Sequence, residues 1–172
     1  MKLFRFVIIL FLITIMLGQA SAQEKQFQAG FRFGATTGFT GRSINSDMWA
    51  LEGILGFRNG GAQLYGLLEK HTRLEFPRTD RFFLYYGGGA HIGFVGWHKY
   101  YDSDYYSHRN YWDRYTNYGV AFGIDGILGL EYRFEAVPIT LGVDFKPFFE
   151  FYGPFYFRVN FWDFSGGIRY TF

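Results

Sequence analysis

The chain has 172 residues, of which 49% are hydrophobic and 24% aromatic, and it contains no cysteine. The missing cysteines exclude a disulfide scaffold and a thiolate metal site. A formal net charge of only +2 argues against the strongly basic surface of a nucleic-acid-binding protein, so no nucleic acid is expected as a partner. So many aromatic side chains with so little net charge also exclude intrinsic disorder.

The first segment has the three parts of a secretory signal peptide. Lys2 and Arg5 precede an apolar stretch over residues 7–17, and Ala20-Ser21-Ala22 follows as a cleavage site. The apolar stretch would rise about 16 Å as a helix, roughly half of a bilayer core, so a retained anchor is the weaker interpretation. We predict a cleaved signal peptide over 1–22 and one domain over 23–172. Because cleavage removes two basic residues and no acidic one, the mature domain carries no net charge.

The rest of the chain alternates large apolar residues with small or charged ones, most clearly over 118–134. Alternation with a period of two is the signature of β-strands, since successive side chains point to opposite faces. The uncharged stretch 82–98 approaches the length of a spanning helix, but its glycines disfavour a helix. The pattern predicts eight strands, at 26–34, 38–44, 49–58, 62–71, 81–96, 117–134, 138–150 and 156–172.

The two faces of these strands differ in a way that predicts which face is outside. One face is bulky and aromatic, whereas the other combines glycine with Asp, Glu and Arg. Glycine weakens a strand and is usually placed where space is tight, which suits the interior of a narrow barrel. Apolar residues outside and polar residues inside are typical of a transmembrane β-barrel. The alternative is a secreted soluble β-sandwich or a lipocalin-like barrel.

An eight-stranded antiparallel up-and-down barrel brings both chain ends to the same side, which we expect to be the periplasm. The connections 45–48, 72–80 and 135–137 then also fall on that side. The connections near 35–37, 59–61, 97–116 and 151–155 face outward, so the long loop lies on the outer side.

The last eight residues resemble the C-terminal signal of Gram-negative outer membrane barrels. In that signal a polar residue, a glycine, a hydrophobic residue and a terminal aromatic stand at fixed spacing, and these are Ser165, Gly167, Tyr170 and Phe172 here. The resemblance implies a bacterial outer membrane location, contact with outer membrane lipid, and insertion by the barrel-assembly machinery.

Over most of its length the chain is also similar to a family of small uncharacterised outer membrane β-barrel proteins. The segments 85–93, 123–132 and 142–147 carry this resemblance. In architecture the chain is similar to the outer membrane protein X family. That likeness concerns shape and implies no activity.

The inward faces of the predicted strands contain a polar set with nearly balanced charge. An eight-stranded barrel is just wide enough for side chains to fill, and a buried charge there must be paired. We therefore predict a plug of mutually satisfied ion pairs. The alternatives are a narrow conduit for ions or small solutes and a binding site for a small polar ligand. The predicted interior residues are Arg32, Glu52, Glu69, His91, Asp125, Glu131, Arg133, Asp144, Lys146 and Arg169.

The sequence does not predict an enzyme, a cofactor or a metal site. No Ser, His and acidic residue stand at a recognisable catalytic spacing, and His91 is better explained as a packed interior histidine. Asp102 and Asp104, together with His98 and His108, form only a weak cation motif.

The loop 97–117 is the most distinctive outer feature, because tyrosine mixed with polar residues and balanced charge is typical of adaptable binding loops. We predict recognition of an extracellular protein or glycan by this loop. The alternative is that its aromatics form part of the outer membrane girdle. The candidates are Trp97, Tyr100, Tyr101, Tyr105, Tyr106, Tyr111, Trp112 and Tyr115.

Overall fold

The computed structural model describes residues 25–172 except 59, 78, 99–115 and 153–155, so the predicted signal peptide lies outside the described residues. No helix among the described residues is long and apolar enough to cross a membrane. The strands are β1 (Gln26–Gly34), β2 (Thr37–Ile44), β3 (Trp49–Arg58), β4 (Gly61–Phe76), β5 (Thr79–His98), β6 (Thr116–Arg133), β7 (Ile139–Phe145), β8 (Phe148–Tyr152), β9 (Tyr156–Asn160) and β10 (Phe164–Thr171).

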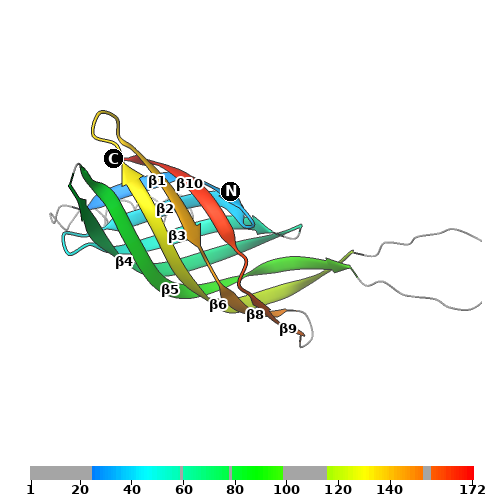
Figure 1. Cartoon of the computed structure of the whole chain (residues 1–172). Helices are drawn as coiled ribbons and strands as arrows, with labels where there is room; N and C mark the ends of the chain where they lie inside the picture. The colour runs from blue at the N-terminus through cyan, green and yellow to red at the C-terminus, as the bar shows by residue number, and fades with distance from the viewer. Residues whose placement is uncertain (1–24, 59, 78, 99–115, 153–155) are drawn as a thin grey trace, which may run out of the picture.

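These ten segments form one closed antiparallel barrel (Figure 1). β1 to β6 each pair with their neighbours in sequence, and β6 pairs with both β7 and β8, which lie end to end as one wall strand. β9 and β10 form the next wall strand in the same way, and β10 pairs with β1 to close the ring. The predicted eight-stranded antiparallel barrel is confirmed, and a two-sheet sandwich is wrong for this chain.

The last two wall strands are interrupted at the same level, which the predicted strands 138–150 and 156–172 did not show. Phe145 pairs with Phe164 and Phe148 with Asn160, so two residues on one strand face three on the other. This extra residue is a β-bulge. Pro147 on the opposite strand has no N–H to donate, although its carbonyl accepts from Gly126 N at 2.9 Å.

The two ends of the barrel differ in their connections. At the terminal end, where β1 begins and β10 ends, the links are 45–48, 77–78 and 134–138. At the loop end, β5 and β6 remain paired out to His98 and Thr116, so the predicted long loop leaves from a two-stranded extension. The predicted connection 72–80 is wrong. β4 and β5 run on to Phe76 and Thr79, because their pairing continues beyond His71.

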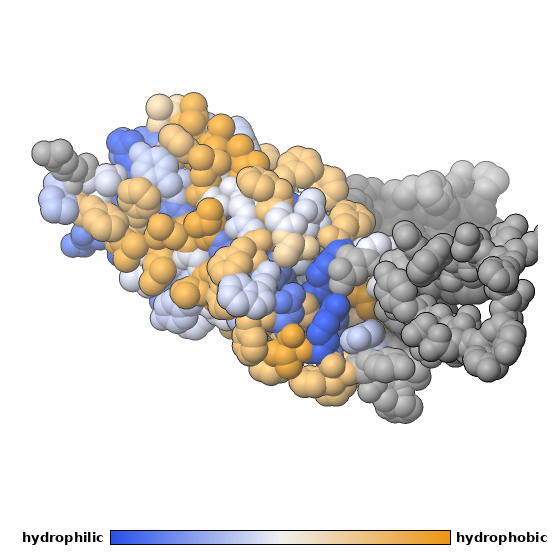
Figure 2. Space-filling view, turned by 45° about the vertical axis from the view of Figure 1, so that its right-hand side comes forward, coloured by the Kyte–Doolittle hydropathy of each residue, from blue (hydrophilic) through white to orange (hydrophobic). Residues whose placement is uncertain are grey.

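Inside and outside are inverted relative to a soluble protein. The outward faces carry large exposed hydrophobic residues, such as Phe122 at 56% and Val143 at 62% exposure, and the inward faces carry buried charged residues. Figure 2 shows hydrophobic residues over much of the visible wall.

Two inward glycines make room for ring side chains inside the barrel. A Cβ on Gly129 would lie 2.2 Å from Cζ of Tyr85, and a Cβ on Gly123 would lie 2.6 Å from Cε1 of His91. Both distances are far shorter than a van der Waals contact. The glycines of β6 therefore allow rings from β5 to lie across a narrow interior.

Candidate functional site

The barrel interior is the candidate site, because the polar residues predicted from the sequence converge there. Nine of the ten are buried, and the Arg133 side chain retains 17% exposure near the terminal end. Including residues outside the predicted set, the interior holds seven cationic side chains and seven carboxylates among the described residues. The cations are Arg32, Arg42, Arg58, Arg133, Lys146, Arg158 and Arg169, and the carboxylates are Glu52, Glu69, Asp125, Glu131, Asp144, Glu150 and Asp163.

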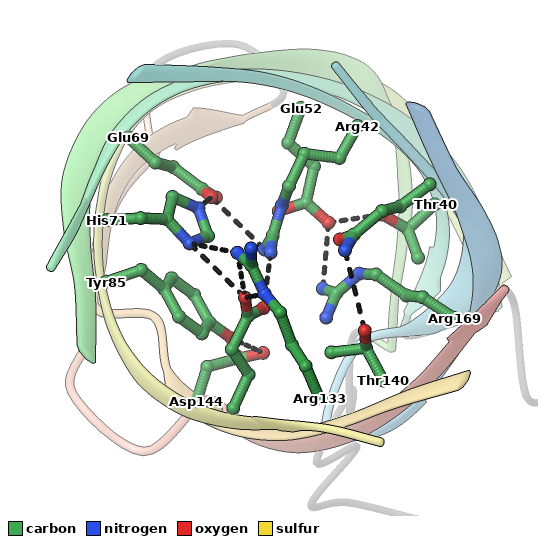
Figure 3. A network of polar contacts seen from close by, with 12 residues as sticks. Thr40, Arg42, Glu52, Glu69, His71, Tyr85, Arg133, Thr140, Asp144 and Arg169 are labelled. Carbon is green, nitrogen blue, oxygen red and sulfur yellow. Dashed lines mark hydrogen bonds and ion pairs between the residues drawn. The ribbon is translucent and has the colours of Figure 1, made fainter. Parts of the chain in front are cut away.

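The polar side chains nearer the terminal end form what we call the terminal-end network (Figure 3). Arg42 of β2 is its centre: its guanidinium lies 2.8 Å from Glu52, 3.1 Å from Glu69 and 2.8 Å from Glu131. These carboxylates come from β3, β4 and β6, so one side chain connects strands on opposite sides of the ring. Arg169 of β10 adds a contact of 2.9 Å to Glu52.

His71 completes this network. Its Nε2 lies 3.3 Å from Glu69, and its Nδ1 lies 3.4 Å from Glu131 and 3.3 Å from Arg133 Nη2. Apart from this ring the terminal-end network is matched in charge: Arg42, Arg133 and Arg169 balance Glu52, Glu69 and Glu131.

An apolar layer crosses the middle of the interior. It consists of Ile54, Tyr65, Leu67, Tyr85 and Ile127, which are all buried. On β3, β4 and β6 these residues stand between the carboxylates of the terminal-end network and the polar residues nearer the loop end. The Tyr85 hydroxyl donates to Asp144 at 3.2 Å, and Asp144 pairs with Arg32 at 2.6 Å. The middle of the barrel is thus filled by rings, aliphatic side chains and one ion pair.

Beyond this layer lies a second cluster, which we call the loop-end network. Lys146 connects Asp125 at 3.2 Å with Asp163 at 3.0 Å. His91 of β5 lies between two carboxylates, with Nδ1 2.7 Å from Asp125 and Nε2 3.1 Å from Glu150. Arg58 of β3 and Arg158 of β9 also bind Glu150.

Several central residues lie outside the set predicted from the sequence, for different reasons. Arg42 lies on a short polar strand whose alternation is weak, and Arg158 lies before the bulge, which reverses its inward parity relative to Arg169. Asp163 could have been found, because it continues the inward alternation of Arg169. Arg58 and Glu150 could have been found, because they continue the inward alternation of Glu52 and Asp144. His71 is the last residue of the predicted strand 62–71 and has the inward parity of Glu69, so it too could have been found.

The other predicted site residues are distributed as follows. Ser165 is buried and Gly167 faces inward, whereas Tyr170 and Phe172 lie on the outer wall. Phe172 N donates to Phe27 O at 2.8 Å, which ties the chain end to β1. Of the loop candidates, Trp97 falls in β5, paired with Asn117. The other seven loop residues and the Asp102–Asp104 motif lie outside the described residues.

Two pockets adjoin the barrel. A pocket of about 280 Å³ at the terminal end is lined by residues of the 134–138 link and by Gln26 and Arg133. A larger apolar pocket of about 550 Å³ lies on the outer wall of β5, β6, β8 and β9, among Phe122, Phe149 and Phe157. In the part of the chain that the structure describes, no cluster of three or more His, Asp or Glu side chains is arranged to hold a metal ion.

Substitution of Glu131 tests whether the ion pairs of the interior stabilise the barrel. We expect Glu131→Leu to lower the free energy of unfolding by about 3–5 kcal/mol, because Arg42 and Arg133 then lose a buried partner. The measurement is urea unfolding of the refolded barrel. Glu135→Leu is the matched control, since Glu135 forms an exposed pair with Arg81 in the 134–138 link, and it should change stability little. Equal effects of the two substitutions would contradict a structural role of the network.

No protein-family model matches this chain, and no curated protein matches it. The features of the barrel that bear on its function are the apolar outer wall, the two polar networks inside, and the apolar layer between them.

Proposed function

We propose that this protein is an integral outer membrane β-barrel with a side-chain-filled interior, which acts as a structural or surface-interaction protein. The observation that carries the proposal is the inversion of polarity. Fully buried ion pairs occupy the interior, while aromatic and aliphatic side chains cover the wall. In water so large an apolar surface would drive association, whereas in a bilayer it is the favourable arrangement.

A closed barrel also meets the main requirement of a bilayer for backbone groups. Without water, every N–H and C=O in the hydrocarbon core needs a partner, and the β1–β10 ladder leaves no open edge over most of the wall. The predicted signal peptide and the resemblance of 165–172 to the barrel-assembly signal support the outer membrane as the location.

Membrane embedding predicts an asymmetric response to a charge on the wall. Val143 lies on the outward face of β7, away from both ends of its strand. We expect Val143→Lys to destabilise the barrel in lipid vesicles by about 2–4 kcal/mol, as for a lysine near the bilayer midplane. Stability is measured by denaturant titration with heat-modifiable gel mobility as the readout of folding.

A lysine introduced in the 134–138 link by Ala136→Lys is the control and should change the stability of the barrel little. A soluble barrel would tolerate Val143→Lys as well as Ala136→Lys, so equal tolerance would overturn the membrane proposal.

The filled interior favours a barrel that does not conduct. The apolar layer and the Arg32–Asp144 pair occupy the cross-section between the two polar networks. We expect the refolded protein to insert into planar bilayers without stepwise conductance. Reproducible conductance steps would support the alternative function, a narrow channel or small-ligand transporter. Interior polar atoms without a hydrogen-bond partner among the described residues favour this alternative.

The surface-interaction role is assigned to the loop 97–117. β5 and β6, which lead into this loop, remain paired out to His98 and Thr116. The tyrosines of the loop suit protein or glycan contacts. We expect replacement of 100–114 by a short Gly/Ser linker to abolish binding to host cells or to a glycan array, with heat-modifiable mobility unchanged. Binding that survives the replacement would contradict this role.

A further inference from the structure

In the loop-end network four donor side chains share the carboxylate of Glu150. Glu150 Oε1 accepts from Arg58, from Gln63 Nε2 at 3.1 Å and from His91 Nε2 at 3.1 Å. Glu150 Oε2 accepts from Arg158 Nη2 at 2.5 Å. Four side chains from β3, β4, β5 and β9 thus converge on a single anionic group.

The charges of this network do not balance. Each nitrogen of His91 contacts a carboxylate oxygen, which has no hydrogen to give, so the ring carries both protons when both contacts are made. His91 is then a cation. Arg58, His91, Lys146 and Arg158 therefore exceed their carboxylate partners, Asp125, Glu150 and Asp163, by one positive charge.

The two arginines also retain donors without partners. Nε and Nη1 of Arg58 and Nε of Arg158 have no hydrogen-bond partner among the described residues, although the Arg58 side chain is only 5% exposed. The Arg58 guanidinium lies 3.9 Å from the centroid of the Phe148 ring, which holds its plane in place. Buried donors of a charged group are costly to leave unpaired, so this position favours an additional acceptor.

The network can be reached from outside the barrel. The Arg158 side chain is 32% exposed, and among the described residues β9 pairs only with β8, which leaves its other edge open. Figure 2 shows a hydrophilic strip beside the grey residues, bordered by hydrophobic side chains. An anion at the loop end therefore has a route to the guanidinium groups.

We propose that Arg58 and Arg158 form a binding site for a phosphate group at the loop end of the barrel. Planar guanidinium groups bind phosphate through paired hydrogen bonds, and a phosphate offers enough acceptors for both arginines at once. Glu150 occupies the place of the anion in the unliganded barrel and competes with it. The phosphate belongs either to a soluble phosphorylated compound or to a lipid headgroup reached through the open edge of β9. The site requires the barrel alone and does not depend on whether the barrel conducts.

The test uses the full mature chain refolded in a maltoside detergent, which contains no phosphate. Inorganic phosphate and pyrophosphate are titrated by calorimetry, with chloride at equal ionic strength as the reference. We expect saturable binding at one site, weakened about tenfold or more by Arg158→Gln, since a charge-assisted hydrogen bond is lost. The matched control is Arg73→Gln, because Arg73 lies at the terminal end in an exposed pair with Asp80.

Glu150→Gln gives a prediction of opposite sign. Removing the competing carboxylate charge should tighten phosphate binding, whereas a merely structural role of Glu150 would leave phosphate binding unchanged or weaker. Heat-modifiable mobility of each variant reports folding separately. If Glu150→Gln does not fold, the comparison of Arg158→Gln with Arg73→Gln still decides the question.

The source of the phosphate is decided in vesicles. If the ligand is a lipid headgroup, phosphorus NMR of the barrel in phosphatidylglycerol vesicles should show a change in the headgroup chemical shift that depends on Arg158. If soluble phosphate saturates the site and the headgroup signal does not shift, the ligand is a soluble phosphate compound. Absence of phosphate binding in both media, or equal affinity of Arg158→Gln and Arg73→Gln, would overturn the site. That result would leave the membrane proposal intact, because the latter depends on Val143→Lys and on heat-modifiable mobility.

Discussion

The pairing of charges inside a narrow closed barrel is the constraint on which the rest of this structure depends. Among the described residues, fourteen Arg, Lys, Asp and Glu side chains share an interior that only eight strands enclose. Each must find an opposite charge inside the barrel, because an unpaired buried charge costs several kcal/mol. Arg42 satisfies this requirement most fully by joining carboxylates from three strands. Pairs such as Arg42–Glu131 and Arg58–Glu150 thus act across the ring, whereas the ladder hydrogen bonds act only between neighbouring strands.

Room for these side chains comes from glycine, and the resulting interior is layered along the barrel axis. Gly129 and Gly123 of β6 lie against the rings of Tyr85 and His91. The large side chains of β5 thus fill the space that the glycines of β6 leave free. The Tyr85 ring then belongs to the apolar layer that separates the two networks. The terminal-end network is matched in charge, and the loop-end network has a surplus of donors around Glu150.

The bulge opposite Pro147 determines which side chains of β9 and β10 face the loop-end network. One extra residue in 161–163 reverses the inward parity between β9 and β10, so that Arg158 and Asp163 both face the interior. Without the extra residue, one of these two would point outward. β9 lies beyond the β1–β10 ladder that closes the barrel. Among the described residues, the edge of β9 that faces away from β8 is therefore unpaired near Arg158.

The sequence by itself determined the strand class, the number of wall strands and the inward face of most strands, because alternation with a period of two is a local property of the chain. It also predicted ten interior residues, of which eight lie in the two networks and two, Arg32 and Asp144, form the ion pair between them. Only the tertiary structure decided which charges meet. The partners of Arg42 come from three different strands, and the inward position of Arg158 relative to Arg169 depends on a bulge that alternation cannot reveal. Cross-ring contacts depend on strand register and closure, which are properties of the whole barrel.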